Sequence, residues 1–270
     1  MKRILTLAGL ISAACALAAA QGNSPGRIVV PARNGSRPRI VEANLLHGSV
    51  TVHTGSGNDV IVEAPSLEHR ASTQQPHGTE GMRRIDIPRF TPLQVDEEGD
   101  TVHINVMPGS AAEGGIILTV PVNTSLKLNC THGAIKVDGV HGEIDASDVH
   151  GDITLTDVSG TVIANTTHGF IKAVMDRVDT SKPLSFVTLD GNVDVTLPAD
   201  LRATLRMKTV HGEIWSDFDV KLTGGGGPIT IGGPGRARFD FDREVTGSIN
   251  GGGTEITLNT VNGRILIHKK

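Results

Sequence analysis

A nine-residue repeat of glycine and alternating aliphatic residues runs through the middle of the chain. The glycines Gly133, Gly142, Gly151, Gly160 and Gly169 lie nine residues apart, and each begins the pattern glycine, any residue, aliphatic, any residue, small apolar. The same pattern follows four further glycines, namely Gly48, Gly191, Gly212 and Gly263. A fixed short period indicates an architecture of stacked, similar units.

The apolar positions within each unit alternate with polar ones. Every residue two positions after an anchor glycine is Val or Ile, and the residue four positions after is apolar except at Ser216. This period of two predicts one half-buried strand per unit. Val140, Val149 and Val158, seven positions after successive glycines, predict a third inward-facing position.

Two arrangements of such strands are compatible with the repeat: a β-solenoid with about two strands per rung, or an antiparallel up-and-down sheet. Nine residues are too few for a crossover helix between parallel strands. The turns also lack the consistent Asn-Gly pair that tight hairpins favour. We therefore predict an all-β fold, a β-solenoid or single-stranded β-helix-like repeat domain, with a more irregular N-terminal β region.

Residues 1–20 have the order expected of a cleaved signal peptide. Lys2 and Arg3 form a positive start, residues 4–17 are largely apolar, and residues 18–20 are small. An uncleaved anchor is the alternative, but the apolar run is short for a membrane span. A lipidated Cys15 is a further alternative, and the residues before it lack the large aliphatic side chain typical of such a site. We predict an exported protein of the periplasm, cell envelope or extracellular space, with no transmembrane span in the mature chain.

The remaining chain divides by composition. Residues 21–38 are rich in Gly and Pro and predict a linker, and residues 39–270 predict the β-strand-repeat domain, with strict nonapeptide repeats over 132–176. Within that domain, residues 65–100 are polar and contain several prolines, which predicts a long excursion. Residues 223–235 predict a second, glycine-rich loop.

Composition narrows the partners. The net charge is −4 and charges of both signs are interspersed, so no basic stripe is present for a phosphate backbone and nucleic acid is excluded as a partner. After signal removal Cys130 is the only cysteine, which predicts a small buried strand residue and no internal disulfide.

Two stretches carry a family resemblance. Residues 114–121, followed by Leu126-Lys127-Leu128 and the repeats, and the stretch from Gly251 to Ile265 resemble the bacterial putative adhesin family, a domain of unknown function built of β-strand repeats. The resemblance covers about residues 40–270. It implies an exported or envelope-associated protein with a β-solenoid-like fold, and it supplies no catalytic residues. This chain departs from the family in placing His before many of the turn glycines.

The residue before each anchor glycine forms a restricted set. It is histidine at six anchors, and Ser, Asp or Asn at the other three: His47, His132, His141, His150, His168 and His211, then Ser159, Asp190 and Asn262. Because Asn, Asp and His tolerate a positive φ, a turn requirement is the first interpretation.

Metal binding is the functional alternative for this set. His132, His150 and His168 are eighteen residues apart, so in a solenoid with two strands per rung they stack on one edge at about 4.8 Å. Imidazoles at that spacing could share Zn²⁺, Cu²⁺ or Ni²⁺.

No catalytic or cofactor motif occurs in the sequence: metalloprotease, nucleophile-elbow and phosphate-loop patterns are all missing. The sequence therefore predicts no enzyme, no catalytic residues and no cofactor. We expect a binding or structural module whose partner is an envelope protein, a polysaccharide or a surface, with self-association possible at the solenoid ends. A polysaccharide-active enzyme on a β-helix scaffold and a metal-binding envelope protein stand as alternatives.

Overall fold

The computed structural model describes residues 26–32, 38–66, 93–107, 114–224 and 244–270. These residues form strands in the following order: β1 (Arg27–Val30), β2 (Ile40–His47), β3 (Val50–Gly55), β4 (Val60–Glu63), β5 (Leu93–Glu98), β6 (Thr101–Val106), β7 (Ile116–Pro121), β8 (Ser125–His132), β9 (Ile135–Asp138), β10 (Ile144–His150), β11 (Ile153–Gly160), β12 (Val162–His168), β13 (Ile171–Val178), β14 (Leu184–Asp190), β15 (Val193–Leu197), β16 (Ala203–Lys208), β17 (Ile214–Ser216), β18 (Lys221–Gly224), β19 (Val245–Ile249), β20 (Thr254–Asn259) and β21 (Ile265–Lys269).

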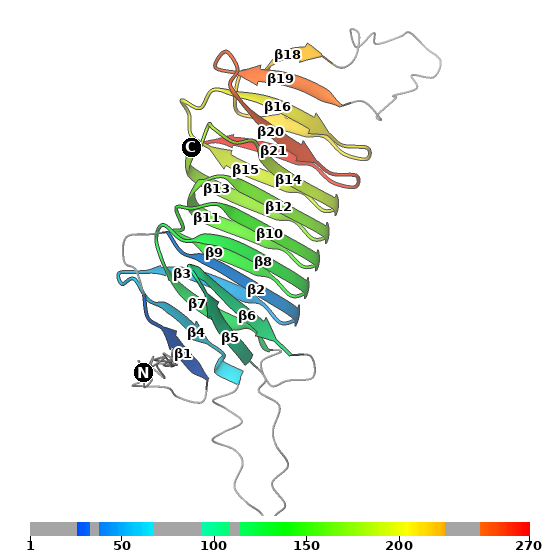
Figure 1. Ribbon diagram of the computed structural model, residues 1–270. Coiled ribbons are helices and arrows are strands. Elements are labelled where there is room, and N and C mark those ends of the chain that lie inside the picture. The colour runs from blue at the N-terminus through cyan, green and yellow to red at the C-terminus, as the bar shows by residue number, and fades with distance from the viewer. Residues whose placement is uncertain (1–25, 33–37, 67–92, 108–113, 225–243) are drawn as a thin grey trace, which may run out of the picture.

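From β6 to β18, successive strands alternate between two sheets that face each other along the molecule (Figure 1). Sheet A has ten strands in the order β1-β4-β7-β3-β9-β11-β13-β15-β21-β17, and sheet B has eleven in the order β18-β19-β16-β20-β14-β12-β10-β8-β2-β6-β5. From β8 to β15 each rung contributes one strand to each sheet, and neighbouring rungs pair in parallel. The predicted β-solenoid is confirmed, and its parallel pairing excludes the antiparallel up-and-down alternative.

The core lies between the two sheets and is almost entirely aliphatic. Along β10, Ile144 and Ala146 are fully buried while Asp145 and Ser147 lie on the outer face. The same alternation recurs on every rung of the repeat, as the period of two predicts. Cys130 lies in this core as a free, buried thiol, which confirms its predicted role as a small strand residue.

The spatial order of the rungs departs from chain order at both ends. The rung β2/β3 lies between β6/β7 and β8/β9, although it comes first in the sequence. At the other end, β20/β21 is inserted between β14/β15 and the earlier rung β16/β17. Both insertions are parallel, so the two sheets continue through them without a break in strand direction.

Antiparallel strands complete each end of the solenoid. β1 pairs with β4, which pairs with β7, and β5 pairs with β6 at the N-terminal end. β18 and β19 extend β16 at the C-terminal end. The sequence predicted an irregular β region only at the N-terminal side.

Two predicted non-strand segments contain strands. β1 lies within residues 21–38, predicted as a linker, because Ile28 to Val30 pair with β4. β5 lies within residues 65–100, predicted as an excursion, because Leu93 and Val95 alternate with polar residues and pair with β6. In the predicted glycine-rich loop 223–235, Thr223 and Gly224 belong to β18, and the rest lies outside the described residues, as does the predicted signal peptide.

The turn interpretation of the residue before each glycine is wrong. Among the described non-glycine residues, only Asp157 and Asn250 have a positive φ, and neither occupies that slot. His47, His132, His150 and His168 instead end their strands, and His141 and His211 form isolated β-bridges. The glycine is required by close approach: a Cβ on Gly151 would lie 1.4 Å from the carbonyl oxygen of Gly133 on the next rung.

A second ladder lies just inside these turns. We call the position directly before each anchor glycine the histidine slot. Two residues before it, the side chains of five rungs donate a hydrogen bond to the carbonyl oxygen of a turn glycine on the adjacent rung. The pairs are Thr166 to Gly151, Thr188 to Gly169, Thr260 to Gly191, Thr209 to Gly263 and, through sulfur, Cys130 to Gly48. Asp148 occupies the same position as these donors, paired in register with Thr166. The ladder therefore has a carboxyl group at a position where its neighbours supply a donor.

Candidate functional site: the histidine edge and the sheet B groove

Four histidines stack along the edge where sheet B turns into sheet A. The ring centroids of His47 and His132 are 5.1 Å apart, those of His132 and His150 are 4.8 Å apart, and those of His150 and His168 are 5.1 Å apart. All four side chains are exposed. The predicted stacking of His132, His150 and His168 is confirmed, and His47 extends it by one rung because β2 is inserted beside β8.

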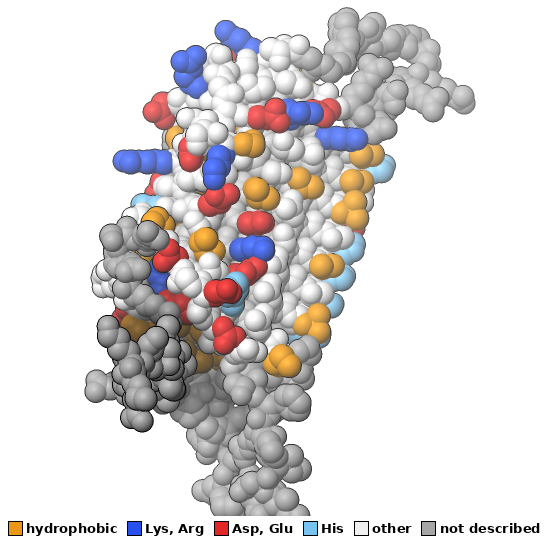
Figure 2. Space-filling view, viewed as in Figure 1, with side chains coloured by type: hydrophobic (Ala, Val, Ile, Leu, Met, Phe, Trp, Pro, Cys, Tyr) orange, Lys and Arg blue, Asp and Glu red, His pale blue; other side chains and the backbone are white. Residues whose placement is uncertain are grey.

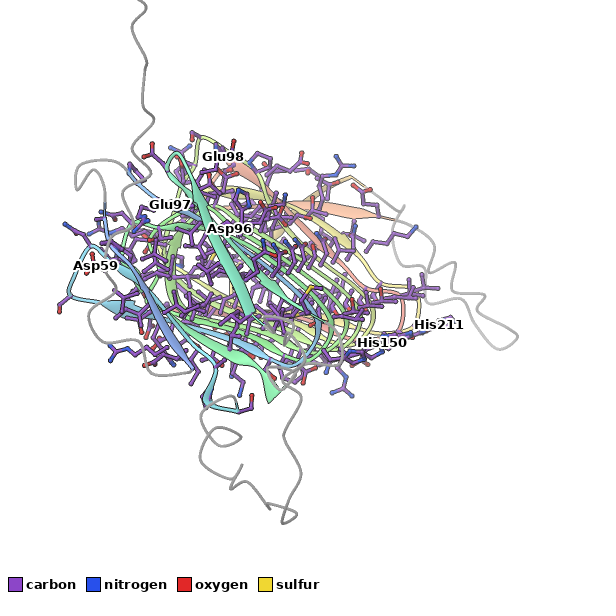
Figure 3. The ribbon with its side chains drawn as sticks, turned by 60° about the horizontal axis from the view of Figure 1, so that its bottom comes forward. Asp59, Asp96, Glu97, Glu98, His150 and His211 are labelled. Atoms are coloured by element: carbon purple, nitrogen blue, oxygen red, sulfur yellow. The ribbon has the colours of Figure 1, made fainter. Side chains whose placement is uncertain are left out.

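The same edge continues as a hydrogen-bonded chain. His168 Nδ1 lies 2.9 Å from a carboxylate oxygen of Asp190, Asn262 donates to Asp190, and His211 Nδ1 lies 3.0 Å from Asn262 Oδ1. Viewed nearly along the solenoid, His150 and His211 lie on the same side and Asp59 on the opposite one (Figure 3). One column of imidazole, carboxylate and amide groups therefore follows this edge over seven rungs. His141 lies apart from it, because its turn with Ser159 is on the other edge.

The predicted metal ligands are brought together, but their nitrogens do not converge. The His132 and His150 rings are within 5° of parallel, so their in-plane nitrogens point side by side. Two nitrogens bind one ion at about 2.0–2.1 Å each, which requires at least one ring to rotate. Among the described residues, no group of three or more His, Cys, Asp and Glu side chains is placed to hold one ion.

Metal binding by His132, His150 and His168 stays a prediction. Elemental analysis of protein purified without a histidine tag and dialysed against zinc tests it. A metal-free protein after that treatment would contradict it.

A column of exposed or half-buried apolar and threonine side chains runs beside the histidines on sheet B (Figure 2). On seven strands it consists of the residue directly before the histidine slot, and on β6 it consists of Met107, which lies beside Leu46. In the order of the strands in sheet B, its members are Met107, Leu46, Thr131, Val149, Thr167, Leu189, Val261 and Val210. Val149 was predicted to point inward like Val140 and Val158, yet it is 38% exposed while those two are fully buried. The reason is strand parity, since Asp148 takes the inward position of β10.

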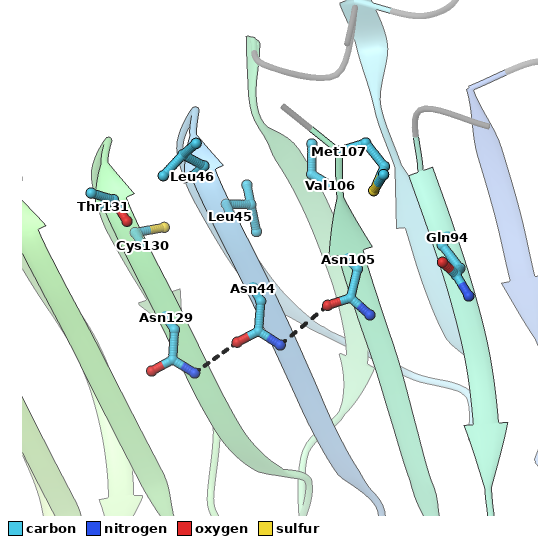
Figure 4. Close-up of a pocket in the computed structure, with 10 residues that line it drawn as sticks. All are labelled: Asn44, Leu45, Leu46, Gln94, Asn105, Val106, Met107, Asn129, Cys130 and Thr131. Atoms are coloured by element: carbon cyan, nitrogen blue, oxygen red, sulfur yellow. Dashed lines mark hydrogen bonds between the residues drawn. The ribbon is translucent and has the colours of Figure 1, made fainter. Parts of the chain in front are cut away.

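An open groove lies next to this column at the N-terminal end of sheet B (Figure 4). Its volume is about 480 Å³, and Leu46 and Met107 stand among its lining residues. On its floor, Asn129 donates to Asn44 at 2.9 Å, and Asn44 donates to Asn105 at 3.3 Å. The asparagines align because β8, β2 and β6 pair in register. Sequence analysis did not single out these amides, since the pairing of β2 with β6 joins residues about sixty positions apart.

Beneath the edge, Asp148 and Cys130 are buried titratable groups. Asp148 is 5% exposed, and neither of its carboxyl oxygens has a hydrogen-bond partner. Burial raises the pKa of Asp148, and the nearby backbone amides of His150 and Val149 oppose this only in part. Burial, with the adjacent Asp148, raises the pKa of Cys130 to about 12, so its thiol stays protonated at neutral pH.

Similarity of this chain to curated proteins and to solved structures is limited. Among curated proteins, none matches this chain in sequence. Two solved structures are similar at low level: a putative cell adhesion protein from Clostridium sporogenes ATCC 15579 (11% identity, covering 92% of this chain and 100% of that chain, TM-score 0.43) and a putative adhesin from Bacteroides fragilis NCTC 9343 (11% identity, covering 92% and 98%, TM-score 0.39). Scores this low say nothing about function. In the described part of the chain, no helix is both long and apolar enough to span a membrane.

The family match covers the solenoid from its first histidine to the glycine run after β18. Residues 47–226 match the description Toastrack DUF4097, while the closing stretch from Gly251 to Ile265 lies beyond the matched range. The rungs of parallel strands, the turn glycines and this match agree with one another. This chain belongs to the Toastrack family DUF4097, which confirms the resemblance drawn from its sequence.

Proposed function

We propose that this protein is an exported, non-catalytic binding module of the bacterial cell envelope. The observation that carries the proposal is the open groove of about 480 Å³ on sheet B, whose floor is a hydrogen-bonded row of asparagines. The parallel strands beneath fix these amides at rung spacing, so the recognition groups are preorganised.

The lining of the groove suits recognition better than reaction. Its residues are Asn, Gln, Thr, Leu, Val, Met and Cys, and only Cys130 among them can titrate. Because the pKa of Cys130 is about 12, the lining supplies hydrogen bonds and apolar contact rather than a general acid, a general base or a thiolate at neutral pH.

Binding without cleavage is the expected behaviour. The full chain is incubated with a native envelope fraction and with a panel of glycans, and bound material and product lengths are measured. We expect retention of envelope material with glycan lengths unchanged. Reproducible release of shorter chains would favour the polysaccharide-active enzyme instead and overturn the proposal.

Export is tested separately through the N-terminal segment. We expect the chain expressed in a bacterial host to lie outside the cytoplasm, with a mature N-terminus near Gln21. A variant with Lys2→Glu and Arg3→Glu should be exported less efficiently, because the positive start of the signal is lost. An intact N-terminus in cytoplasmic protein would contradict this part of the proposal.

A further inference from the structure

The groove is one end of a longer three-column face. The outward residues of sheet B form one column that is mostly asparagine, a second of apolar and threonine side chains, and a third at the turn that is mostly histidine. In the first column, Ser147, Val187 and Lys208 replace asparagine on three strands. On β2 these are Asn44, Leu46 and His47, and on β12 they are Asn165, Thr167 and His168. The face thus has polar groups on both sides of a less polar centre.

The dimensions of this face favour a linear ligand over a globular one. It crosses eight strands, β6 to β16, and the seven intervals between them, at about 4.8 Å each, give a length of about 34 Å. Three columns are only about 10 Å wide, so the area is on the order of 300 Å², well below the roughly 800 Å² that each partner buries in a standard protein interface. A second folded protein is therefore a poor fit, and an extended polymer lying across the strands is a good one.

The side chains of the three columns indicate which class of polymer fits this face. The central column carries no charge, and its neighbours are mainly amides and imidazoles, which offer hydrogen-bond donors and acceptors. The charged members of the two flanking columns are Asp190 and Lys208, both toward the C-terminal end. Sugar rings have apolar faces edged by hydroxyl groups that both donate and accept. A neutral glycan therefore matches the centre with its ring faces and both sides with its hydroxyls.

The middle of the central column has a period of two rungs. Leu46, Thr131, Val149, Thr167 and Leu189 alternate between larger aliphatic residues and threonine along five successive rungs, whereas the rungs beyond them carry Met107 on one side and Val261 and Val210 on the other. In an extended β-1,4-linked glycan, successive sugars are turned over, so the chain repeats every two residues. The rung spacing is close to the length of one such sugar, so the two-sugar repeat of the glycan matches the two-rung repeat of these five rungs.

We infer that this three-column face binds an extended, uncharged β-1,4-linked glycan along the solenoid axis, with about one sugar per rung. The inference rests on the proposed binding function and names its ligand class and site. Because the column holds no aromatic platform, each sugar contributes little and affinity accumulates over rungs. Affinity is therefore expected to rise steeply with oligomer length.

Calorimetry on the full chain tests the length dependence, with chitobiose, chitotetraose and chitohexaose as probes. We expect each added pair of sugars to raise affinity by about tenfold, while dextran and polygalacturonate do not bind. Equal affinity for the short and long oligomers, or preference for the anionic polymer, would overturn the inference. If chitohexaose fails to bind but envelope material is still retained, the ligand class is wrong and the binding function stands.

A pair of matched double variants locates the site. Val149→Ser with His150→Ala removes the centre of the face, and Val122→Ser with His141→Ala makes the same changes on the opposite edge, where His141 N–H donates to Val122 O. Val149 and Val122 are each 38% exposed, so the two variants should be equally stable in thermal unfolding. We expect the first to weaken chitohexaose binding at least tenfold and the second to leave it within twofold. Equal binding by both folded variants would place the glycan elsewhere and overturn the site.

Discussion

At the scale of single residues, Asp148 is the position where the hydrogen-bonding pattern of the repeat is broken. Four rungs have threonine in its slot, and each hydroxyl donates to a turn glycine. An ionised carboxylate has no proton to donate and is buried without a partner. Such a group costs folding free energy unless it binds a proton.

The pH dependence follows from the direction of this shift. The pKa of Asp148 is raised in the folded protein above its ordinary value of 3.8. As pH rises between these two values, the unfolded chain releases the proton that the folded chain retains, so stability falls through this window and stays lower above it. We expect Asp148→Thr and Asp148→Asn, which restore a donor, to raise stability near neutral pH by about 1–3 kcal/mol and to remove that fall. Urea unfolding across pH measures it, and variants less stable than wild type at pH 8 would contradict it.

The turn glycines limit how large a side chain can be accommodated between neighbouring rungs. Gly151→Ala places a methyl group against the carbonyl of Gly133, and the rungs must separate to admit it. We expect a loss of about 3 kcal/mol in the free energy of unfolding. Gly57→Ala is the matched control, because the nearest atom to its Cβ would be 3.9 Å away. The explanation by close approach would be wrong if both variants unfolded at the same urea concentration.

At the scale of elements, the N-terminal end depends on a buried ion pair. Arg39, just before β2, lies 2.6 Å from Glu97 of β5, with the two side chains 7% and 11% exposed. Arg39 also donates to the carbonyl oxygen of Val30 in β1 at 3.1 Å. One guanidinium thus connects the end strands of both sheets.

Removing the carboxylate partner should destabilise these strands. Glu97→Ala leaves the buried guanidinium without its counter-charge, and we expect a loss of about 3 kcal/mol. The neighbouring Glu98→Ala, on the exposed side of β5, should change stability by less than about 0.5 kcal/mol. Hydrogen exchange of the β1 and β5 amides, compared between the two variants, shows whether the loss is confined to this end. Equal protection in both variants would mean that the pair contributes nothing there.

The elements also show where sequence reasoning succeeds. The alternation after each glycine predicts the rungs because inward and outward positions are set by local strand geometry. It fails at Val149, because every second residue of β10 from Ile144 onward points inward, and this places Asp148 inside and Val149 outside. The histidine stack followed from the eighteen-residue spacing, whereas the Asn44–Asn105 contact could not, since it depends on which rung is inserted beside which.

At the scale of the whole molecule, the insertion of β20/β21 makes the solenoid depend on residues far along the chain. Ile256 pairs with Leu184 on one side and with Leu205 on the other, and all three are buried. Without the β20/β21 rung, the β14/β15 rung and the β16/β17 rung each lose the strands that pair with them on the facing side.

A truncation tests this dependence. A chain ending at Gly253 should lose cooperative unfolding of the rungs from β14 onward, because the buried faces of Leu184 and Leu205 lose their common neighbour. A synthetic peptide of residues 254–270, added during refolding, should restore it, and a scrambled peptide should not. Circular dichroism during urea unfolding follows both. A truncated chain with an unchanged transition would show that the inserted rung is dispensable.

The inserted rung also bears on the order of events during synthesis. A ribosome makes β14 to β17 before β20 and β21, so these earlier strands wait for a neighbour that has not yet been translated. The C-terminal half of the solenoid therefore cannot complete its sheets before β20 and β21 have been translated. For a protein that we propose is exported, this delay keeps that half of the nascent chain open to the export machinery until translation has passed Lys269, where β21 ends.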